Sequence, residues 1–213
     1  MKTQTAKKVA RRKRTSSVPR RRDGILTIVL ARHGKPDWDE KTLIPGHGLR
    51  QWVRGRDAAP IVPSVRPPED LVRLGRSCRV VAASTLRRSL ESAELVVPGI
   101  APRVHAMFKE VAPPTQIRIG LRLRPQLWSW LARAAWYCGW SPGVESYAEA
   151  RERAAAAAEA LTDLALEEES VILVGHGIMN GMIGKQLRHA GWSGPLLRPR
   201  RLWAHATYHF MTR

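Results

Sequence analysis

The chain has 213 residues, with 36 Lys and Arg against 18 Asp and Glu, which gives a formal charge of +18 at pH 7. This length suffices for one domain with a sizeable core, no internal repeat is visible, and two cysteines are too few for a disulfide framework or a cysteine metal cluster. No apolar run reaches the roughly 18 residues of a membrane-spanning helix and the N-terminus lacks the apolar core of a secretory signal, so we expect a reduced, cytoplasmic protein without a transmembrane segment.

The positive charge is concentrated at the N-terminus, where residues 1–22 hold ten basic residues and no acidic one. This stretch has almost no apolar residue to bury, so we expect a disordered tail followed by a single domain over residues 23–213. Because clustered cations release counterions from polyanions, one interpretation is weak contact with nucleic acid or an anionic surface. A solvated extension or a targeting peptide is the other, and the absence of any aromatic stacking residue favours it.

The first predicted element is a strand over Ile25–Leu30, an uninterrupted apolar run typical of a strand buried on both faces. Arg32, His33 and Gly34 follow it directly. In open α/β sheets, ligands bind just outside the carboxyl ends of the strands. A cationic side chain and an imidazole at that position suit an anionic substrate, so Arg32 and His33 are the first candidate site residues.

Between Pro36 and Met107 the pattern predicts short elements separated by Pro- and Gly-rich turns. Apolar residues recur at helical spacing over residues 86–97, and Pro98–Gly99 closes that helix. The expected elements are helices near residues 49–54 and 69–74, a strand at 79–82, a helix at 86–97 and a strand at 103–107.

Residues 126–140 form a Trp-rich apolar helix candidate. Three arginines, Arg118, Arg122 and Arg124, precede it. One interpretation is a membrane-surface or partner-binding helix, because Trp and Arg favour interfaces. We favour the other, an inserted helix that caps the active-site cleft, because the stretch is too short to span a bilayer and contains one charge.

The alanine-rich stretch Glu145–Leu166 is the clearest helix in the chain. After it, the apolar run Val171–Val174 predicts a strand that ends at His176, between two glycines. A helix at residues 179–189 and a strand at 202–210 complete the chain. Strands that alternate with helices predict an α/β fold, a three-layer α/β/α sandwich with a mostly parallel central sheet.

The pair Arg32-His33-Gly34 and Gly175-His176-Gly177, each after a buried strand, resembles the histidine phosphatase superfamily, which includes phosphoglycerate mutase-like enzymes and many small phosphatases. The resemblance covers roughly residues 24–211 and implies that family's fold. Residues 83–93 are similar to its strand-to-helix segment, whose arginine binds phosphate four residues before a Thr/Ser-Ala pair. That spacing matches Arg88, with Arg87 as its rival. Phe108-Lys109-Glu110 resembles the segment that carries the family's acid; the alternatives to Glu110 are Glu91, Glu94 and Glu145.

This resemblance implies hydrolysis of a phosphomonoester through a phosphohistidine. Arg32 and Arg88 would each offer a bidentate fork to phosphoryl oxygens. Neutral His33 would attack phosphorus, with its other nitrogen held as N–H by a backbone carbonyl, and His176 would act as a charged phosphate donor. Glu110, if its pKa is raised, would protonate the leaving alkoxide and later deprotonate water. No metal or other cofactor is expected, because the arginines and a histidine supply the positive charge.

The expected substrate is a phosphorylated small molecule or a phosphoprotein. A phosphoglycerate mutase-type phosphotransferase would use the same chemistry, and a non-catalytic phosphate-binding module is the alternative from another class. Asp39 stands where many members of the family have an asparagine that donates to phosphate, and an ionised carboxylate there would repel the ligand.

Overall fold

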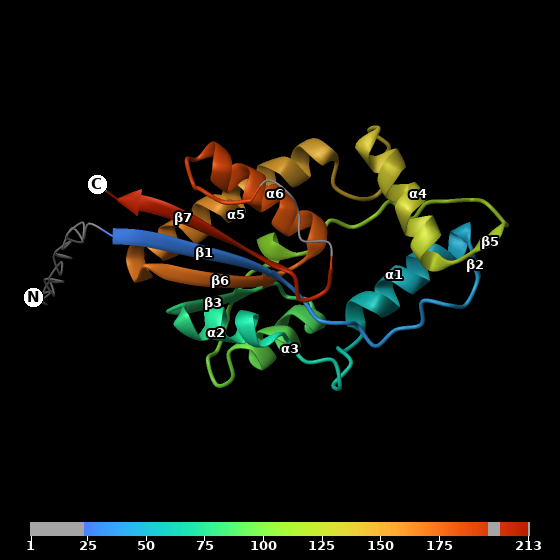
Figure 1. Cartoon of the computed structure of the whole chain (residues 1–213). Helices are drawn as coiled ribbons and strands as arrows, with labels where there is room; N and C mark the ends of the chain where they lie inside the picture. Colours follow the sequence, from blue (N-terminus) through green and yellow to red (C-terminus); the bar gives the residue numbers. More distant parts are fainter. Residues whose placement is uncertain (1–23, 196–200, 213) are drawn as a thin grey trace, which may run out of the picture.

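The structure is a computed structural model that describes residues 24–195 and 201–212 (Figure 1). The predicted N-terminal tail therefore lies outside the described residues. Five strands of one sheet follow the order β4-β3-β6-β1-β7. The strands are β1 (Gly24–Arg32), β2 (Ile44–Pro45), β3 (Val80–Ala83), β4 (Arg103–Val104), β5 (Arg122–Leu123), β6 (Ser170–Gly175) and β7 (His205–Thr212). The helices are α1 (Leu49–Ala58), α2 (Glu69–Ser77), α3 (Arg87–Val96), α4 (Pro125–Tyr137), α5 (Tyr147–Glu168) and α6 (Gly177–His189), with 3-10 turns at Gly46–Gly48 and Ala106–Phe108.

The sheet is mostly parallel, as predicted. β1 pairs in parallel with β6, β6 with β3, and β3 with β4, while β7 runs antiparallel to β1 at one edge. Helices α5 and α6 cover one face of the sheet, and α2 and α3 cover the other (Figure 1). The predicted three-layer α/β/α architecture is confirmed.

The core follows from the apolar run in β1. Ile28 packs into the cluster beneath α5 and α6, and Val29 into the cluster beneath α2 and α3, so both faces of the strand are buried. Burial of each such side chain contributes about 1.5–3 kcal/mol. On α5 the buried face consists almost entirely of alanines, including Ala150, Ala154 and Ala157, and these small side chains let the helix lie close to the sheet.

Two predicted strands differ from the structure. The expected strand at 103–107 ends at Val104, because the His105 ring accepts a hydrogen bond from the Met107 N–H at 3.1 Å and starts a 3-10 turn instead. The expected strand at 202–210 begins only at His205, since Trp203 adopts a φ of 61° in the preceding turn.

The register of the sheet sets the position of the site. Arg32 of β1 lies opposite Gly175 of β6, and Ala83 of β3 lies opposite Val174. The carboxyl ends of these three parallel strands therefore finish at one edge of the sheet. The residues that follow them are His33, Ser84 and His176, which the fold brings together from three distant parts of the sequence.

Helix α4 packs beside α1, away from the main sheet (Figure 1). Trp128 and Ala132 pack on Leu49 of α1, and the Trp128 indole N–H donates to the Ile44 carbonyl at 2.9 Å. Trp136 is fully buried and donates to the Glu145 carbonyl at 2.8 Å. Among the described residues, none of the helices combines the length and the apolar character needed to cross a bilayer.

Candidate active site

His33 is buried directly after β1. Its Nδ1 lies 2.7 Å from the Gly34 carbonyl oxygen, and because a carbonyl can only accept, Nδ1 carries the hydrogen and Nε2 the lone pair. The Arg88 Nε–H donates to that Nε2 at 3.2 Å. Burial, with His176 and Arg88 close by, holds the pKa of His33 well below its usual value. The ring is therefore neutral, with its lone pair directed at a guanidinium.

Position 34 requires glycine, because the Trp203 ring fills the space where a side chain would lie. Its N–H donates to Ser92 Oγ at 2.9 Å, while the His33 N–H donates to the Gly175 carbonyl at 3.0 Å. A Cβ at position 34 would lie 2.3 Å from the Trp203 ring. Any side chain would therefore push the indole away or displace the carbonyl that orients His33.

Burial and side-chain contacts distinguish Arg88 from Arg87 as the candidate phosphate-binding arginine. Arg88 is buried in the first turn of α3, and its Nη1 donates to Asp57 Oδ1 at 2.9 Å and to the Arg56 carbonyl at 3.2 Å. Arg87 points to solvent and pairs with Glu91 at 2.6 Å. The structure thus brings Arg88 to His33 and leaves Arg87 on the surface.

His176 follows β6 and is fully buried. Its ring centroid lies 5.1 Å from that of His33. Its Nε2 is 2.6 Å from Ser84 Oγ, and its buried Nδ1 has no hydrogen-bond partner among the described residues. Burial, followed by the charges of Arg88 and other arginines, holds the pKa of His176 well below its usual value. The His176 ring is therefore neutral in this structure, because it is buried and because guanidinium groups surround it and disfavour a further positive charge. The expected charge on His176 during phosphoryl transfer stays a prediction.

Two buried polar residues hold the strand ends together. Asn180 of α6 accepts a hydrogen bond from the His176 N–H at 3.2 Å and donates to the Ala31 carbonyl at 2.9 Å. Ser89 of α3 donates to the Val174 carbonyl at 2.5 Å and accepts from the Ser84 N–H at 2.9 Å. Neither residue was predicted as a site residue. The feature of the sequence that could have indicated them is a polar side chain within one helical turn of a motif residue.

Glu110 lies at the N-terminus of α6. Its carboxylate accepts hydrogen bonds from the N–H groups of Ile178 at 3.3 Å and Met179 at 3.1 Å, and from that of Val111 at 3.1 Å. A helix N-terminus stabilises negative charge. Burial by itself raises the pKa of Glu110, but the Arg133 guanidinium and the three N–H groups bring it below its usual value. The condition of a raised pKa is therefore not met in this structure, and the carboxylate is ionised.

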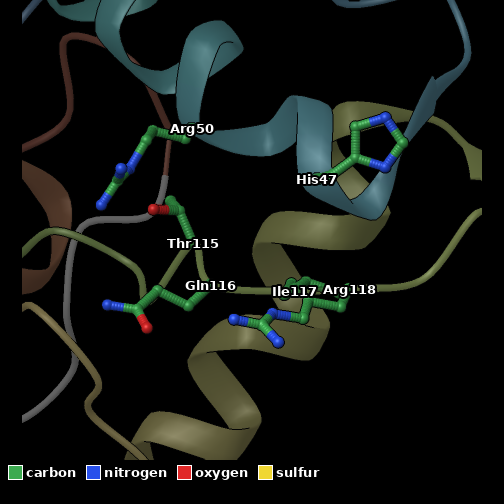
Figure 2. A pocket seen from close by; sticks show the side chains of 6 residues that line it. All are labelled: His47, Arg50, Thr115, Gln116, Ile117 and Arg118. Atoms are coloured by element: carbon green, nitrogen blue, oxygen red, sulfur yellow. The ribbon is translucent and has the colours of Figure 1, made fainter.

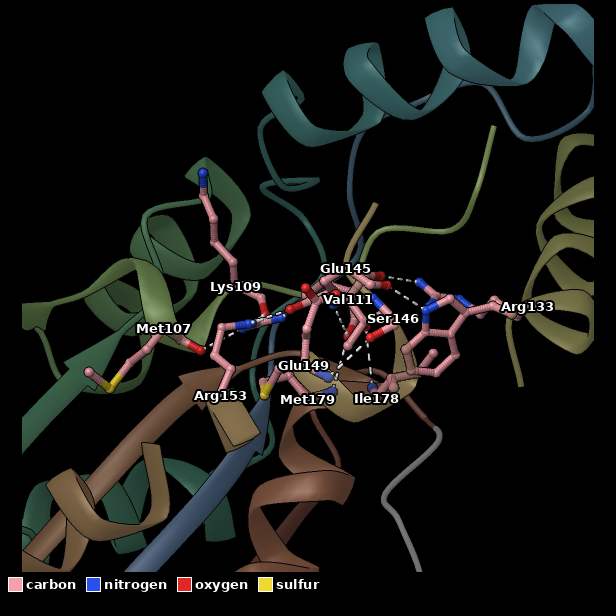
Figure 3. Close-up of polar contacts among 12 residues, drawn as sticks. Met107, Lys109, Val111, Arg133, Glu145, Ser146, Glu149, Arg153, Ile178 and Met179 are labelled. Atoms are coloured by element: carbon pink, nitrogen blue, oxygen red, sulfur yellow. Dashed lines mark hydrogen bonds and ion pairs between the residues drawn. The ribbon is translucent and has the colours of Figure 1, made fainter. Parts of the chain in front are cut away.

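The segment that leads to Glu110 is anchored by Arg153 of α5 (Figure 3). Its Nη1 donates to the carbonyls of Met107 at 2.6 Å and Lys109 at 2.9 Å, while its Nε donates to Glu145 at 2.9 Å. Glu145 is thus engaged in this anchor. Of the other two alternative acids, Glu91 pairs with Arg87, and Glu94 accepts from the Gly99 N–H at 3.2 Å.

Three further arginines converge on the same region. Arg32 ends β1, and its guanidinium carbon lies 3.5 Å from where a Cβ at Gly177 would be; burial lowers its pKa, although Glu110 opposes this. Burial and then the charge of Arg88 lower the pKa of Arg56 to about 10. Arg133 of α4 donates to the Val111 carbonyl at 2.7 Å (Figure 3).

Arg56 and Arg133 were not predicted as site residues. The sequence could have indicated Arg133, since it is the one charged residue within the Trp-rich stretch 126–140. The predicted capping helix therefore delivers a guanidinium next to the predicted acid.

Asp39 is exposed and engaged in its own turn. Its Oδ1 accepts from the N–H groups of Lys41 at 2.8 Å and Thr42 at 3.2 Å. The Thr42 hydroxyl and these N–H groups lower the pKa of Asp39. The acids whose charge raises the pKa of Arg32 and Arg56 are Glu40 and Glu110 instead.

A separate pocket of about 400 Å³ opens between the start of α1 and the segment that follows Glu110 (Figure 2). It contains none of the predicted site residues. Its lining combines basic, polar and apolar side chains and consists of His47, Arg50, Thr115, Gln116, Ile117 and Arg118.

Solved structures with the same fold include enzymes that act on phosphate esters. A mycobacterial glucosyl-3-phosphoglycerate phosphatase, solved with vanadate, superposes with a TM-score of 0.55 at 20% identity, covering 85% of this chain and 92% of that one. A phosphoglycerate mutase from Bacillus anthracis superposes with a TM-score of 0.57 at 15% identity, covering 89% of each chain. At these identities the likeness shows the fold. No curated protein matches the chain significantly.

The sequence profile of the histidine phosphatase superfamily (branch 1) matches residues 70–197, more than half of the chain. This range contains Arg88, Glu110 and His176, while His33 precedes it. The fold then places His33 beside Arg88 and His176. The chain belongs to the histidine phosphatase superfamily (branch 1).

Proposed function

We propose that this protein is a metal-independent phosphatase that hydrolyses phosphomonoesters, either small molecules or phosphoproteins, through a phosphohistidine at His33. The observation that carries the proposal is the state of His33, which is neutral, holds its hydrogen on Nδ1 against the Gly34 carbonyl, and keeps a lone pair on Nε2 beside Arg88. An imidazole with these properties can attack phosphorus in line. The arginines supply the positive charge that a phosphoryl dianion needs, and His176 can add a hydrogen-bond donor.

In the first step the substrate phosphoryl group would replace the contact between Arg88 and His33. The Arg88 Nε–H then donates to a phosphoryl oxygen, which frees the Nε2 lone pair for attack. If the Ser84 hydroxyl donates to Nε2 of His176, Nδ1 of that ring holds the hydrogen and donates to another phosphoryl oxygen. The dianion also offsets the surrounding guanidinium charges, which favours the protonated form of His176 as the reaction proceeds.

Both steps also need a proton carrier for the leaving oxygen and for the attacking water, and we assign this role to Glu110. Its ionised form suits the second step, in which the carboxylate takes a proton from water. For the first step it must be protonated, and a phosphoryl dianion nearby raises the pKa of a carboxyl group through like-charge repulsion.

The phosphoenzyme itself is the most direct test. Purified protein mixed with a ³²P-labelled phosphomonoester in excess chelator and quenched in alkaline detergent after milliseconds should carry label that is stable in base and labile in acid. The label should then pass to water. Turnover without any labelled protein would contradict the covalent route, label that passes only to a second phosphate ester would identify a mutase, and phosphate binding without turnover would identify a binding module.

For Glu110 we predict a substrate-dependent loss in Glu110→Gln. An alkoxide leaving group needs a proton in the transition state whereas a nitrophenolate does not, so phosphorylation by an alkyl phosphate should slow on the order of a hundredfold and phosphorylation by an aryl phosphate should be nearly unchanged. Hydrolysis of the phosphohistidine should slow for both. Rapid-quench kinetics with the aryl substrate should therefore show a product burst followed by a slow steady state.

Because Glu110 also caps the first turn of α6, the variant needs a stability control. Glu145→Gln is the matched variant, since this carboxylate joins the anchor around Arg153 and does not contact α6 in the described part of the chain. An equal loss on both substrates without a burst would show that Glu110 only supports the helix terminus.

Two further assignments extend the proposal. We infer that residues 23–213 form the catalytic domain and that residues 1–22 form a separate basic tail, whose contact with nucleic acid or an anionic surface stays a prediction.

We also propose a cytoplasmic location. In support, Cys78 and Cys138 are free thiols, and burial raises the pKa of Cys78 to about 11, which keeps that thiol unreactive.

A further inference from the structure

Helix α4 is apolar on two opposite sides. The inner side carries Trp128, Ala132 and Trp136, which are buried. Leu127, Trp130, Leu131 and Ala134, spaced by three and four residues, form the opposite side, and all four are exposed. We call these four residues the α4 outer face. Trp130, at its centre, is 71% exposed, so this face leaves a large apolar area in water.

The sequence on either side of this face carries positive charge and no negative charge. Residues 111–144 contain four arginines and no Asp or Glu. Arg133 turns inward to the Val111 carbonyl, while Arg118, Arg122 and Arg124 are exposed on the segment that enters the helix. We call these three the arginine segment. Two exposed apolar residues, Ile119 and Leu121, lie between its arginines.

We propose that the α4 outer face docks on an anionic lipid surface. Trp130 and the two leucines would enter the boundary between headgroups and acyl chains, where Trp side chains are favoured. The arginine segment would lie at the level of the lipid phosphates, where each arginine adds electrostatic attraction. The proposal concerns a helix lying on the membrane, and it is independent of the phosphatase activity.

The positive charge of the chain favours an anionic lipid surface over a second copy of the chain as the binding partner of the α4 outer face. A second copy of the chain carries the same formal charge of +18, and like charges oppose association. An anionic lipid surface complements both the apolar face and the arginines.

The position of α4 gives the docking a consequence for the active site. The same helix delivers Arg133 to the Val111 carbonyl and its charge to Glu110, so a membrane bound to the outer side of α4 contacts a helix that also reaches the predicted acid. The strands β1 and β7 begin and end at the opposite end of the molecule (Figure 1). Docking through α4 therefore holds the site next to the lipid surface and leaves that opposite end in solution.

The test is sedimentation of the full-length chain with vesicles of phosphatidylcholine alone or with 30 mol% phosphatidylglycerol, roughly the anionic content at which polybasic surfaces bind. The wild-type protein should partition onto the anionic vesicles, and binding should weaken as salt is raised. The combined variant Leu127→Ser, Trp130→Ser and Leu131→Ser should lose at least about tenfold in partition coefficient. Replacement of Arg118, Arg122 and Arg124 by Gln should lower it by about fivefold per arginine.

The basic tail requires a control, because residues 1–22 could hold the chain on anionic vesicles by charge alone. Phospholipids with brominated acyl chains quench only Trp side chains that enter the membrane, and they should quench a component that Trp130→Phe removes. Met211→Ser is the matched surface variant, since Met211 is 74% exposed on β7, at the other end of the molecule, and it should bind like wild type.

Hydrolysis of a soluble substrate should be unchanged in the triple serine variant, because none of its three residues belongs to the predicted site. Equal binding of wild type and this variant, or the absence of quenching by brominated lipid, would overturn the proposal in favour of the tail. A wild-type dimer in solution that Trp130→Ser converts to a monomer would overturn it in favour of self-association.

Discussion

The His33→Ala variant should lose turnover by at least about a thousandfold and should accumulate no phosphoenzyme, because removal of a covalent nucleophile eliminates the reaction path itself. In the structure no other imidazole can replace it. His176, the neighbouring ring at 5.1 Å, has one nitrogen at Ser84 and follows a different strand. Alkaline quench with labelled substrate and steady-state hydrolysis measure the two losses separately.

The matched control is His189→Ala, which removes an exposed histidine from the end of α6 and should leave both measurements unchanged. Thermal unfolding should show that the His33→Ala protein is folded, since the N–H groups of residue 33 and Gly34 keep their bonds to the Gly175 carbonyl and Ser92 without the imidazole. Hydrolysis near the wild-type rate by the folded variant would falsify the mechanism.

The second large effect is expected for Arg88→Ala, with a loss in kcat/KM on the order of a hundredfold or more, because a buried charged donor is removed from beside the nucleophile. Affinity for inorganic phosphate as a competitive inhibitor should fall as well. Arg87→Ala is the matched variant on the same helix turn. Its guanidinium pairs with Glu91 at the surface, so kcat/KM should stay within about threefold of wild type.

Arg88 also forms an ion pair with Asp57, so its removal takes away a structural contact as well as a phosphate donor. The Asp57 side chain is 42% exposed, and water can solvate it once the guanidinium is gone. Arg88→Lys separates the two roles, because lysine keeps the charge but cannot donate from a planar Nε to His33 and from Nη1 to Asp57 at once. A mild Arg88→Ala together with a severe Arg87→Ala would reverse the assignment along α3.

Local signals in the sequence determined the elements of the fold. The β-branched runs Ile25–Leu30 and Val171–Val174 are strands because both of their faces are apolar, and the alanine-rich α5 begins at a Ser146–Glu149 capping box. Their alternation with helices was enough to predict a three-layer sandwich. The strand boundaries at Val104 and His205 were missed, because a His105 side-chain bond and a turn at Trp203 decided them.

The motif residues were also identifiable from the sequence, because glycine beside histidine at two strand ends is a local pattern. Their ionisation was not. The lowered pKa values of His176 and Glu110 in this structure could not be predicted, because each pKa depends on burial and on groups from elsewhere in the chain. For His176 these are burial and guanidinium groups of β1, α1 and α3; for Glu110 they are Arg133 and the N-terminus of α6.

The sequence by itself determined which segments are strands and helices and which two histidines end the central strands, because those properties depend on neighbouring residues. Only the tertiary structure decided that Arg88 and not Arg87 meets His33, that Arg56 and Arg133 join the site, and that the outer side of α4 stays exposed. The physical reason is that side-chain partners and electrostatic environments are set by contacts between distant segments. A one-dimensional pattern contains the residues but not their separation in space.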